Sequence, residues 1–168
     1  MPLPPYLSNQ AVFEEIRVDK DVDGVNPANI VGNFSFYLID LIIREKDPLF
    51  IPATAKGCLY IIQQYFPSVI GKRAVVVGQS AIAGAPIAYS LQNMDAAVTS
   101  CNIMTRNLPK ITKEADILVV SIGNPLFIKG DWIKPGALVV DVGTSVVPDP
   151  NSKTGTRVVG DVDFDEVT

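Results

Sequence analysis

A glycine-containing turn between a strand and a helix is the segment whose residue types and spacing could hold a ligand. The turn has the pattern Gly78-x-Ser80-x-x-x-Gly84 and follows an apolar, β-branched run at 74–77. Such a run is typical of a strand buried on both faces. Because the turn leaves backbone N–H groups free at a helix N-terminus, it can hold a phosphate. The spacing is one residue longer than the usual dinucleotide fingerprint, so an ordinary strand-to-helix turn stays an alternative.

Two further loops carry glycine where the sequence predicts that strands end. They contain Gly123-Asn124 and Gly143-Thr144, and each follows an apolar run. Ligands of open parallel sheets bind at the carboxyl ends of the strands, and glycine lets a flat cofactor approach the backbone. Three such ends in one chain favour a dinucleotide site over three unrelated turns.

The end of the second predicted strand bears on which dinucleotide could bind. A carboxylate about 20 residues after the first glycine would bind the 2′-hydroxyl of NAD, and an arginine would suit the 2′-phosphate of NADP. This position offers Asn102, which could hydrogen-bond a ribose, and Arg106 is the nearest cation. Because Arg106 lies in a polar loop, it is better interpreted as a solvated residue than as a phosphate ligand. The sequence therefore does not decide between NAD and NADP as the cofactor.

The composition excludes several kinds of chemistry. There is no histidine, so imidazole bases and Ser-His or Cys-His nucleophiles are excluded. Two separated cysteines, Cys58 and Cys101, make a zinc site improbable and fit reduced thiols of a cytoplasmic protein, with an organelle left open. The net charge of −4 argues against nonspecific nucleic-acid binding. No apolar run reaches the roughly 18 residues of a membrane span.

Two acidic groups were weighed as sites. Asp21 and Asp23 precede Gly24, and an Asx-turn is as good an interpretation there as a substrate contact. Acidic residues near the end have no calcium-loop spacing, and we expect a solvated tail. They are Asp161, Asp163, Asp165 and Glu166.

The elements that must position these residues alternate along the chain, which predicts a parallel, doubly wound α/β sheet. The predicted strands are 74–77, 97–100, 117–121, 137–142 and 157–159. The predicted helices are 9–16, 30–44, 83–93, 108–114 and one that starts near Pro52 and stops at Pro67.

Apolar spacing gives two of these helices a predicted buried side. For the helix after Pro52, Thr54 is the expected N-cap and the buried side is Cys58, Leu59, Ile61, Ile62 and Phe66. For the helix after the glycine turn, the apolar face is Ile82, Pro86, Ile87 and Leu91. The 168 residues suit one domain plus part of another, with the boundary near Phe50.

Many short segments, in order over nearly the whole chain, match one known family. They are Pro2-Leu-Pro4, Lys20–Gly24, Phe50–Thr54, Lys56-Gly57, Gly71–Gly78, Ser80, Ile82, Gly84, Pro86, Ala115–Val120, Ile128–Gly130, Lys134–Ala137, Asp141–Gly143 and Val158–Val162. The chain thereby resembles the bifunctional methylenetetrahydrofolate dehydrogenase/methenyltetrahydrofolate cyclohydrolase family.

The resemblance implies a two-domain α/β protein with a folate in the cleft and NAD or NADP on a Rossmann-like C-terminal domain. Residues 1–50 would be a remnant of the folate domain, and 51–168 the cofactor domain. Asp23 matches the aspartate that contacts the pterin, and Thr54 matches a threonine of the Pro-Cys-Thr-Pro segment. Ser80 and Ile82 match cofactor-loop positions. The implied substrate is a tetrahydrofolate derivative. The apolar part of the predicted helix at 34–43 needs a partner surface, which predicts association with a second copy or a missing domain.

The departures from the family pattern concern groups aimed at folate or cofactor. None of the five tyrosines is followed by lysine four residues later, so the family's Tyr-x-x-x-Lys lysine is absent and no catalytic residue is predicted. Gln79 replaces the cofactor arginine, and Cys101-Asn102-Ile103 replaces Cys-His-Ser. Pro-Cys-Thr-Pro has become Pro52-Ala-Thr-Ala55, and a Pro-Gly-Gly-Val-Gly-Pro segment does not follow.

Two functions are therefore carried forward. The first is a truncated or degenerate NAD(P)-dependent dehydrogenase/cyclohydrolase whose missing groups come from elsewhere. The second is a non-catalytic nucleotide-binding or scaffold protein derived from the family.

Overall fold

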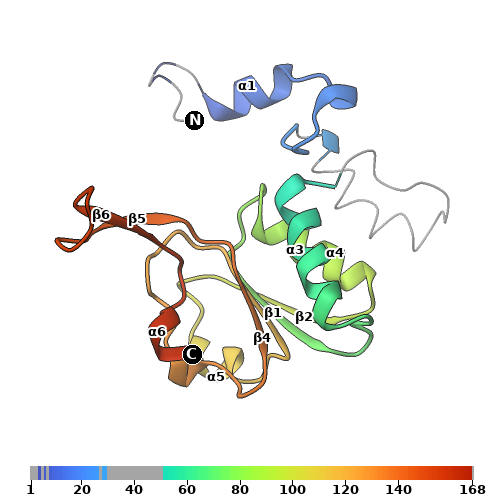
Figure 1. The fold of residues 1–168 in the computed structure, drawn as a ribbon. Coiled ribbons are helices and arrows are strands. Elements are labelled where there is room, and N and C mark those ends of the chain that lie inside the picture. The colour runs from blue at the N-terminus through green and yellow to red at the C-terminus, as the bar shows by residue number, and fades with distance from the viewer. Residues whose placement is uncertain (1–3, 5, 7, 27, 30–50, 168) are drawn as a thin grey trace.

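A four-stranded parallel sheet forms the centre of the computed structural model (Figure 1). The structure describes residues 4, 6, 8–26, 28–29 and 51–167. The strands are β1 (Arg73–Val77), β2 (Ala97–Cys101), β3 (Ile117–Val120) and β4 (Leu138–Asp141), in the order β2-β1-β3-β4. Each lies within one residue of its predicted bounds, so the parallel α/β sheet is confirmed. Strands β1 and β3 are buried on both faces and are continuous apolar runs, which is why their bounds were predictable.

Both faces of the sheet are covered. Helices α3 (Ala53–Tyr65) and α4 (Gly84–Asn93) pack on one face (Figure 1). Their buried side chains join the alternate residues Ala74 and Val76 of β1 in one core. The short helix α5 (Leu108–Thr112) covers the other face, where Val75 and Val77 enter a second core. Burial on both sides of β1 is the pattern of a doubly wound sheet.

The strand order places a topological switch between β1 and β3. From β1 the chain crosses to β2 on one side, and then returns to form β3 on the other side. Connections that leave adjacent strands in opposite directions open a crevice at the carboxyl ends, which is where such sheets bind ligands.

A two-stranded antiparallel hairpin follows the sheet and extends away from it (Figure 1). It consists of β5 (Ser145–Pro148) and β6 (Thr156–Val159). The sequence predicted β6 but assigned no strand at 145–148, because that run is short and ends in proline. Two short helices, η2 (Gly130–Trp132) and α6 (Phe164–Val167), contact each other near the end of the chain.

The N-terminal segment contains α1 (Asn9–Glu15) and the 3₁₀ turn η1 (Val18–Lys20). The predicted helix at 9–16 is confirmed, and Ser8 Oγ accepts the Ala11 N–H at its start. The predicted helix at 30–44 and the proposed boundary near residue 50 lie outside the described residues.

Three details of the helix predictions were wrong. Helix α3 begins at Ala53 after Pro52, so Thr54 lies inside its first turn and is not the N-cap. The buried side of α3 is Ala55, Cys58 and Ile62. Ile61 is 46% exposed, because it lies to one side of the helical face that these three residues share. Ile82 is 49% exposed and precedes α4.

Candidate functional site

The glycine turn after β1 brings two strand ends and a helix start into direct contact. Gly78 has φ +131°, and a Cβ there would overlap the Ser121 carbonyl oxygen at the end of β3. A Cβ on Gly84 would overlap the Gly78 carbonyl oxygen. Both positions therefore require glycine, since only it fits this conformation and this approach of backbone to backbone. The Gly78 N–H donates to the Cys101 carbonyl at 2.9 Å, which ties the turn to the end of β2.

The N-terminus of α4 is held at the carboxyl end of β1 by this turn. The Ser80 carbonyl accepts N–H bonds from Ala83 at 3.3 Å and Ala85 at 3.1 Å, and Ser80 Oγ accepts from Ile82 at 3.3 Å. Ala83 is the N-cap and has no side-chain oxygen to satisfy the first N–H groups of α4. A helix N-terminus without a side-chain cap is suited to an anionic group such as a diphosphate.

Gln79 and Asn102 meet across the ends of β1 and β2. Asn102 Nδ2 donates to Gln79 Oε1 at 2.9 Å, and Gln79 Nε2 lies 3.5 Å from Ser100 Oγ. The structure thus joins two predicted site residues that lie far apart in the sequence, beside the glycine turn. Ser80 and Ile82 are exposed at the same turn.

The loop after β3 is held by a buried carboxylate. Asp161 Oδ2 accepts the N–H groups of Ile122 at 2.7 Å and Gly123 at 3.0 Å. The Asp161 side chain is fully buried. This leaves Gly123, at φ +66°, and Asn124 exposed at the carboxyl edge, which is the edge of the sheet where its parallel strands end.

The loop after β4 packs against the same carboxylate. A Cβ on Gly143 would overlap the Asp161 carboxyl group, so Gly143 is required for the carboxylate to lie there. Asp141, the last residue of β4, accepts N–H bonds from Gly143 at 2.9 Å, Asp161 at 3.1 Å and Val162 at 2.8 Å. Thr144 follows and is exposed. Asp141 and Asp161 therefore connect the loops after β3 and β4 to the segment that follows the hairpin.

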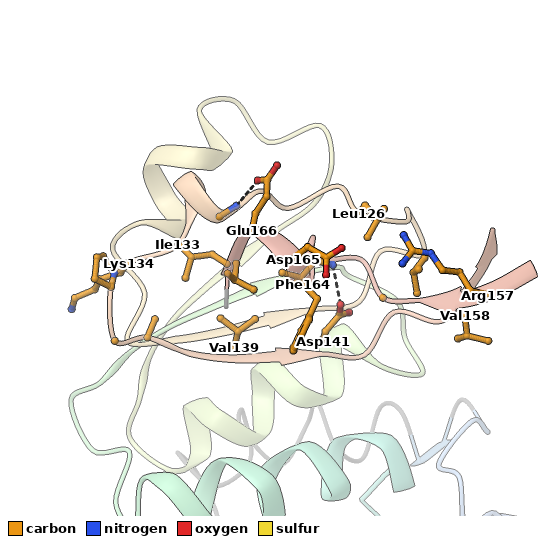
Figure 2. Close-up of a pocket in the computed structure, with 18 residues that line it drawn as sticks. Leu126, Ile133, Lys134, Val139, Asp141, Arg157, Val158, Phe164, Asp165 and Glu166 are labelled. Atoms are coloured by element: carbon orange, nitrogen blue, oxygen red, sulfur yellow. Dashed lines mark hydrogen bonds between the residues drawn. The ribbon is translucent and has the colours of Figure 1, made fainter. Parts of the chain in front are cut away.

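The prediction of a solvated acidic tail was wrong for Asp161 and Asp163, whereas Asp165 and Glu166 are exposed. Asp161 is buried, and Asp163 forms an ion pair with Lys129 at 2.8 Å, whose hydrogen bond raises the pKa of the lysine. Glu166 accepts the Gly130 N–H at 3.0 Å (Figure 2). Charge spacing could not reveal these partners, because each lies more than 30 residues away in the sequence.

Sequence reasoning gave three residues of this edge no role in the site: Asp141, Asp161 and Ser121. Two of their side-chain oxygens, Asp161 Oδ1 and Ser121 Oγ, are buried without a hydrogen-bond partner in the described part of the chain. Their position directly after or beside predicted strand ends was the available signal. A polar residue at the end of a buried apolar strand lies at the edge where ligands bind.

The N-terminal segment carries the predicted substrate contact. Asp23 is exposed, while its neighbour Asp21 is buried and accepts bonds from the Asn26 N–H at 2.7 Å and Asn29 Nδ2 at 2.8 Å. Burial would raise the pKa of Asp21, but these hydrogen bonds outweigh it and hold the pKa below its usual value. Asp21 rather than Asp23 therefore stabilises the turn.

Gly24 packs on the start of α3, since a Cβ there would lie 3.0 Å from Pro52 Cγ. This contact brings the turn that carries Asp23 beside the first turn of α3, where Thr54 is exposed. The two residues assigned to folate and cofactor by resemblance thus occur on adjoining segments of the structure.

A cavity of about 850 Å³ lies along β4, beside β6 and α6 (Figure 2). Its lining includes Ile133, Lys134, Val139, Val158 and Phe164, and none of the predicted cofactor residues. Asp141 at its margin is already bonded to three backbone N–H groups. The chemistry of a dinucleotide site therefore points to the carboxyl edge and not to this cavity.

The described residues offer neither a metal site nor a membrane span. They contain no cluster of three or more His, Cys, Asp or Glu side chains that could hold a metal ion. Within the same ranges, no helix is long and apolar enough to cross a membrane.

The sheet order and the glycine turn at its switch point define a dinucleotide-binding α/β domain of the Rossmann-like class. Residues 52–168 match the family described as tetrahydrofolate dehydrogenase/cyclohydrolase, NAD(P)-binding domain. The chain belongs to this family, as the matching segments in its sequence indicated.

Curated relatives and solved structures agree with this assignment. Over 168 residues the chain is 42% identical to bifunctional protein FolD 4, chloroplastic, and 44% identical to bifunctional protein FolD 2, both from Arabidopsis thaliana. It is covered completely in both alignments but spans only 44% and 54% of those proteins. The names of other relatives specify mitochondrial or cytoplasmic forms.

Among solved structures, the methylenetetrahydrofolate dehydrogenase-cyclohydrolase of Trypanosoma brucei, in complex with NADP cofactor and inhibitor, superposes with a TM-score of 0.85. It is 38% identical, and the alignment covers 99% of this chain and 54% of that one.

Proposed function

We propose that this chain forms the cofactor-binding part of an NAD(P)-dependent methylenetetrahydrofolate dehydrogenase/methenyltetrahydrofolate cyclohydrolase. The observation that carries the proposal is the turn from Gly78 to Gly84, which fits tightly against β3 at the switch point of the sheet. The relatives' names and the solved relative with NADP support it. Residues 51–168 would then be the cofactor domain, and residues 1–50 a remnant of the folate domain.

In this proposal, different residues of the carboxyl edge bind different parts of the dinucleotide. The N-terminus of α4 and the turn residues Ser80 and Ile82 would hold the diphosphate. Gln79 and Asn102 would face the adenosine ribose. The loops with Gly123-Asn124 and Gly143-Thr144 would line the remainder. Tight glycines at two loops and unpartnered polar atoms beneath the edge fit a bound cofactor.

The cofactor, when bound, supplies the hydride acceptor for methylenetetrahydrofolate, and water would then open the methenyl product. This chain's contribution is to bind and orient, and Asp23 is the residue proposed to contact the folate. No general acid or base is assigned, because the Tyr-x-x-x-Lys lysine is absent from the sequence. A positioned acid or base contributes roughly 10²–10⁴ in rate, so the missing groups would have to come from another chain or from residues beyond this sequence.

The second candidate is a non-catalytic nucleotide-binding or scaffold protein derived from the family. Steady-state turnover of methylenetetrahydrofolate by the full gene product, measured beside NAD and NADP binding by calorimetry, separates the two. Turnover with cofactor binding supports the enzyme, binding without turnover supports the scaffold, and absence of dinucleotide binding contradicts both.

We also propose that the chain self-associates through the β5–β6 hairpin. Val146 and Val158 are paired across its two strands, and each is 68% exposed. A pair of exposed valines on a projecting hairpin is an apolar surface suited to a second copy or a missing domain. Light scattering at micromolar concentration should show a dimer, and the double variant Val146→Lys, Val158→Glu should be monomeric. A monomeric unmodified chain would contradict the homodimer.

A cytoplasmic location is the proposed compartment. Its support is that Cys58 and Cys101 are both free and buried, which suits a reducing environment. Fractionation of cells expressing the full gene product tests it, and recovery in an organelle would contradict it.

A further inference from the structure

The hydrogen-bonded pair of Gln79 and Asn102 occupies the position where adenine dinucleotides are distinguished at the ribose. It lies where the first and second strands of the sheet end, and the two strands are neighbours. In dinucleotide-binding sheets an acidic residue at the second strand binds the 2′-hydroxyl of NAD, and an arginine nearby accommodates the 2′-phosphate of NADP. Here neither group is present, and two amides are joined to each other instead.

Hydrogen bonds fix the orientation of Asn102. Its Oδ1 accepts the Met104 N–H at 2.9 Å, and its own N–H donates to Thr105 Oγ1 at 2.9 Å. Because Oδ1 is used in this turn, Nδ2 must face Gln79. The network therefore determines which end of the amide is the donor.

Gln79 is oriented in turn by Asn102. Its Oε1 accepts from Asn102 Nδ2, so its Nε2 is the group left on the outer side, where its contact with Ser100 Oγ is long at 3.5 Å. The side chain is exposed. The site thus presents neutral N–H donors with room to hydrogen-bond a ribose hydroxyl.

The same geometry is poorly suited to a phosphate. A phosphate monoester carries a charge of about −1.5 to −2 at neutral pH and is bound best by charge-assisted, bidentate bonds from arginine. No ion pair or hydrogen bond directs Arg106, an exposed residue of the following loop, toward this pair in the described contacts. A neutral amide pair cannot replace the missing charge.

We propose that Gln79 and Asn102 are specificity-determining residues that donate N–H bonds to the 2′-hydroxyl of NAD and give NADP no advantage. The proposal rests on the proposed dinucleotide site and states which cofactor that site takes.

The test is calorimetric titration of NAD and of NADP into three proteins: the unmodified chain, Gln79→Arg and Arg106→Gln. The unmodified chain should bind NADP no more tightly than NAD. Gln79→Arg should tighten NADP roughly tenfold or more, as expected for one charge-assisted contact, and should weaken NAD, because it removes the amide that binds the 2′-hydroxyl. The gain in NADP affinity should shrink as salt is raised from about 50 to about 500 mM, because salt screens the attraction between the arginine and the 2′-phosphate. Arg106→Gln, the matched charge change in the adjacent loop, should alter neither affinity.

The outcomes separate the two proposals. If the unmodified chain binds NADP tenfold more tightly than NAD, or if Gln79→Arg gains less than fivefold for NADP, this inference is overturned while the dinucleotide site stands. If Arg106→Gln abolishes an NADP preference, Arg106 is the phosphate ligand and the inference is again overturned. If neither dinucleotide binds the unmodified chain or Gln79→Arg, the proposed function fails with it. Because Gln79 is exposed, circular dichroism should show that all three proteins are folded. If Gln79→Arg does not fold, Asn102→Arg is the variant that replaces it in the test.

Discussion

The two sides of the carboxyl edge are built in different ways. On the side of β1 and β2, Gln79 is exposed and Asn102 is half-buried, and both are neutral residues that directly follow the strands. On the side of β3 and β4, a buried Asp161 holds the loop backbone across 38 and 39 residues of sequence. The first side is suited to choosing a ligand, and the second to holding its loops rigid. Substitution of Asp161 should therefore cost stability, and substitution of Gln79 should change selectivity.

The largest effect is expected where backbone meets backbone. Gly84→Ala would place a Cβ against the Gly78 carbonyl and should lower the free energy of unfolding by about 3 kcal/mol. The matched control is Gly57→Ala in α3, where a Cβ meets nothing within 4 Å. Alanine should stabilise that helical position by roughly 0.5–1 kcal/mol. Urea denaturation followed by circular dichroism measures both, and equal effects would mean that the turn is not as tight as described.

The next effect concerns the buried carboxylate. Asp161→Asn keeps the shape but replaces charged acceptors of two N–H bonds, and should cost about 1.5–3 kcal/mol. Asp163→Asn is the control on the same segment. It removes a partly exposed ion pair to Lys129 and should cost only about 0–1 kcal/mol. A larger loss of unfolding free energy for Asp163→Asn than for Asp161→Asn in the same urea measurement would refute the stabilising role given to the buried Asp161.

A smaller effect is expected at the opposite, amino end of the sheet. A hydrogen bond from Lys134 lowers the pKa of Asp116, which also accepts the Arg73 N–H at 3.0 Å. Because the folded pKa is below the unfolded value of about 3.9, this stabilisation is complete above that value and is lost as pH falls through the folded pKa. Both partners are partly exposed, so Asp116→Asn should cost no more than about 1 kcal/mol at pH 7.

The difference between Asp116→Asn and the unmodified chain should narrow below about pH 4. Urea titrations at pH 7 and pH 3 give this comparison. Dinucleotide affinity should be unchanged, and a loss of binding in this variant would show that the site extends beyond the carboxyl edge.

The smallest effect is expected at Ser121. Its hydroxyl is buried without a partner beside Gly78, so Ser121→Ala removes an unsatisfied polar group. The free energy of unfolding should stay within about 0.5 kcal/mol or rise slightly. A loss of 1 kcal/mol or more would reveal a hydrogen bond to this hydroxyl.

The fold was predictable from the sequence where a short apolar run indicates a buried strand. The runs 74–77 and 117–121 gave β1 and β3 because strands buried on both faces are uninterrupted and apolar. The hairpin strand at 145–148 was not assigned, since the run is short, ends in proline and pairs only with its neighbour β6.

The gathering of candidate residues at one edge was predictable on both of its sides, since Gly123 and Gly143 also follow predicted strands. Gly78, Gln79 and Asn102 could be placed because strand ends gather at one edge. The role of Asp161 could not, because its hydrogen bonds depend on the return of the chain after the hairpin. Its charge was therefore assigned to solvent, although the side chain is fully buried.

The most direct test of a dinucleotide site at the carboxyl edge is the map of backbone amide shifts in the ¹⁵N-labelled chain as NAD is added. The structure predicts the largest changes at Gly78, Gln79, Gly84, Gly123 and Gly143, on both sides of the edge. Changes confined to residues of the cavity along β4, or no changes at millimolar NAD, would contradict the site.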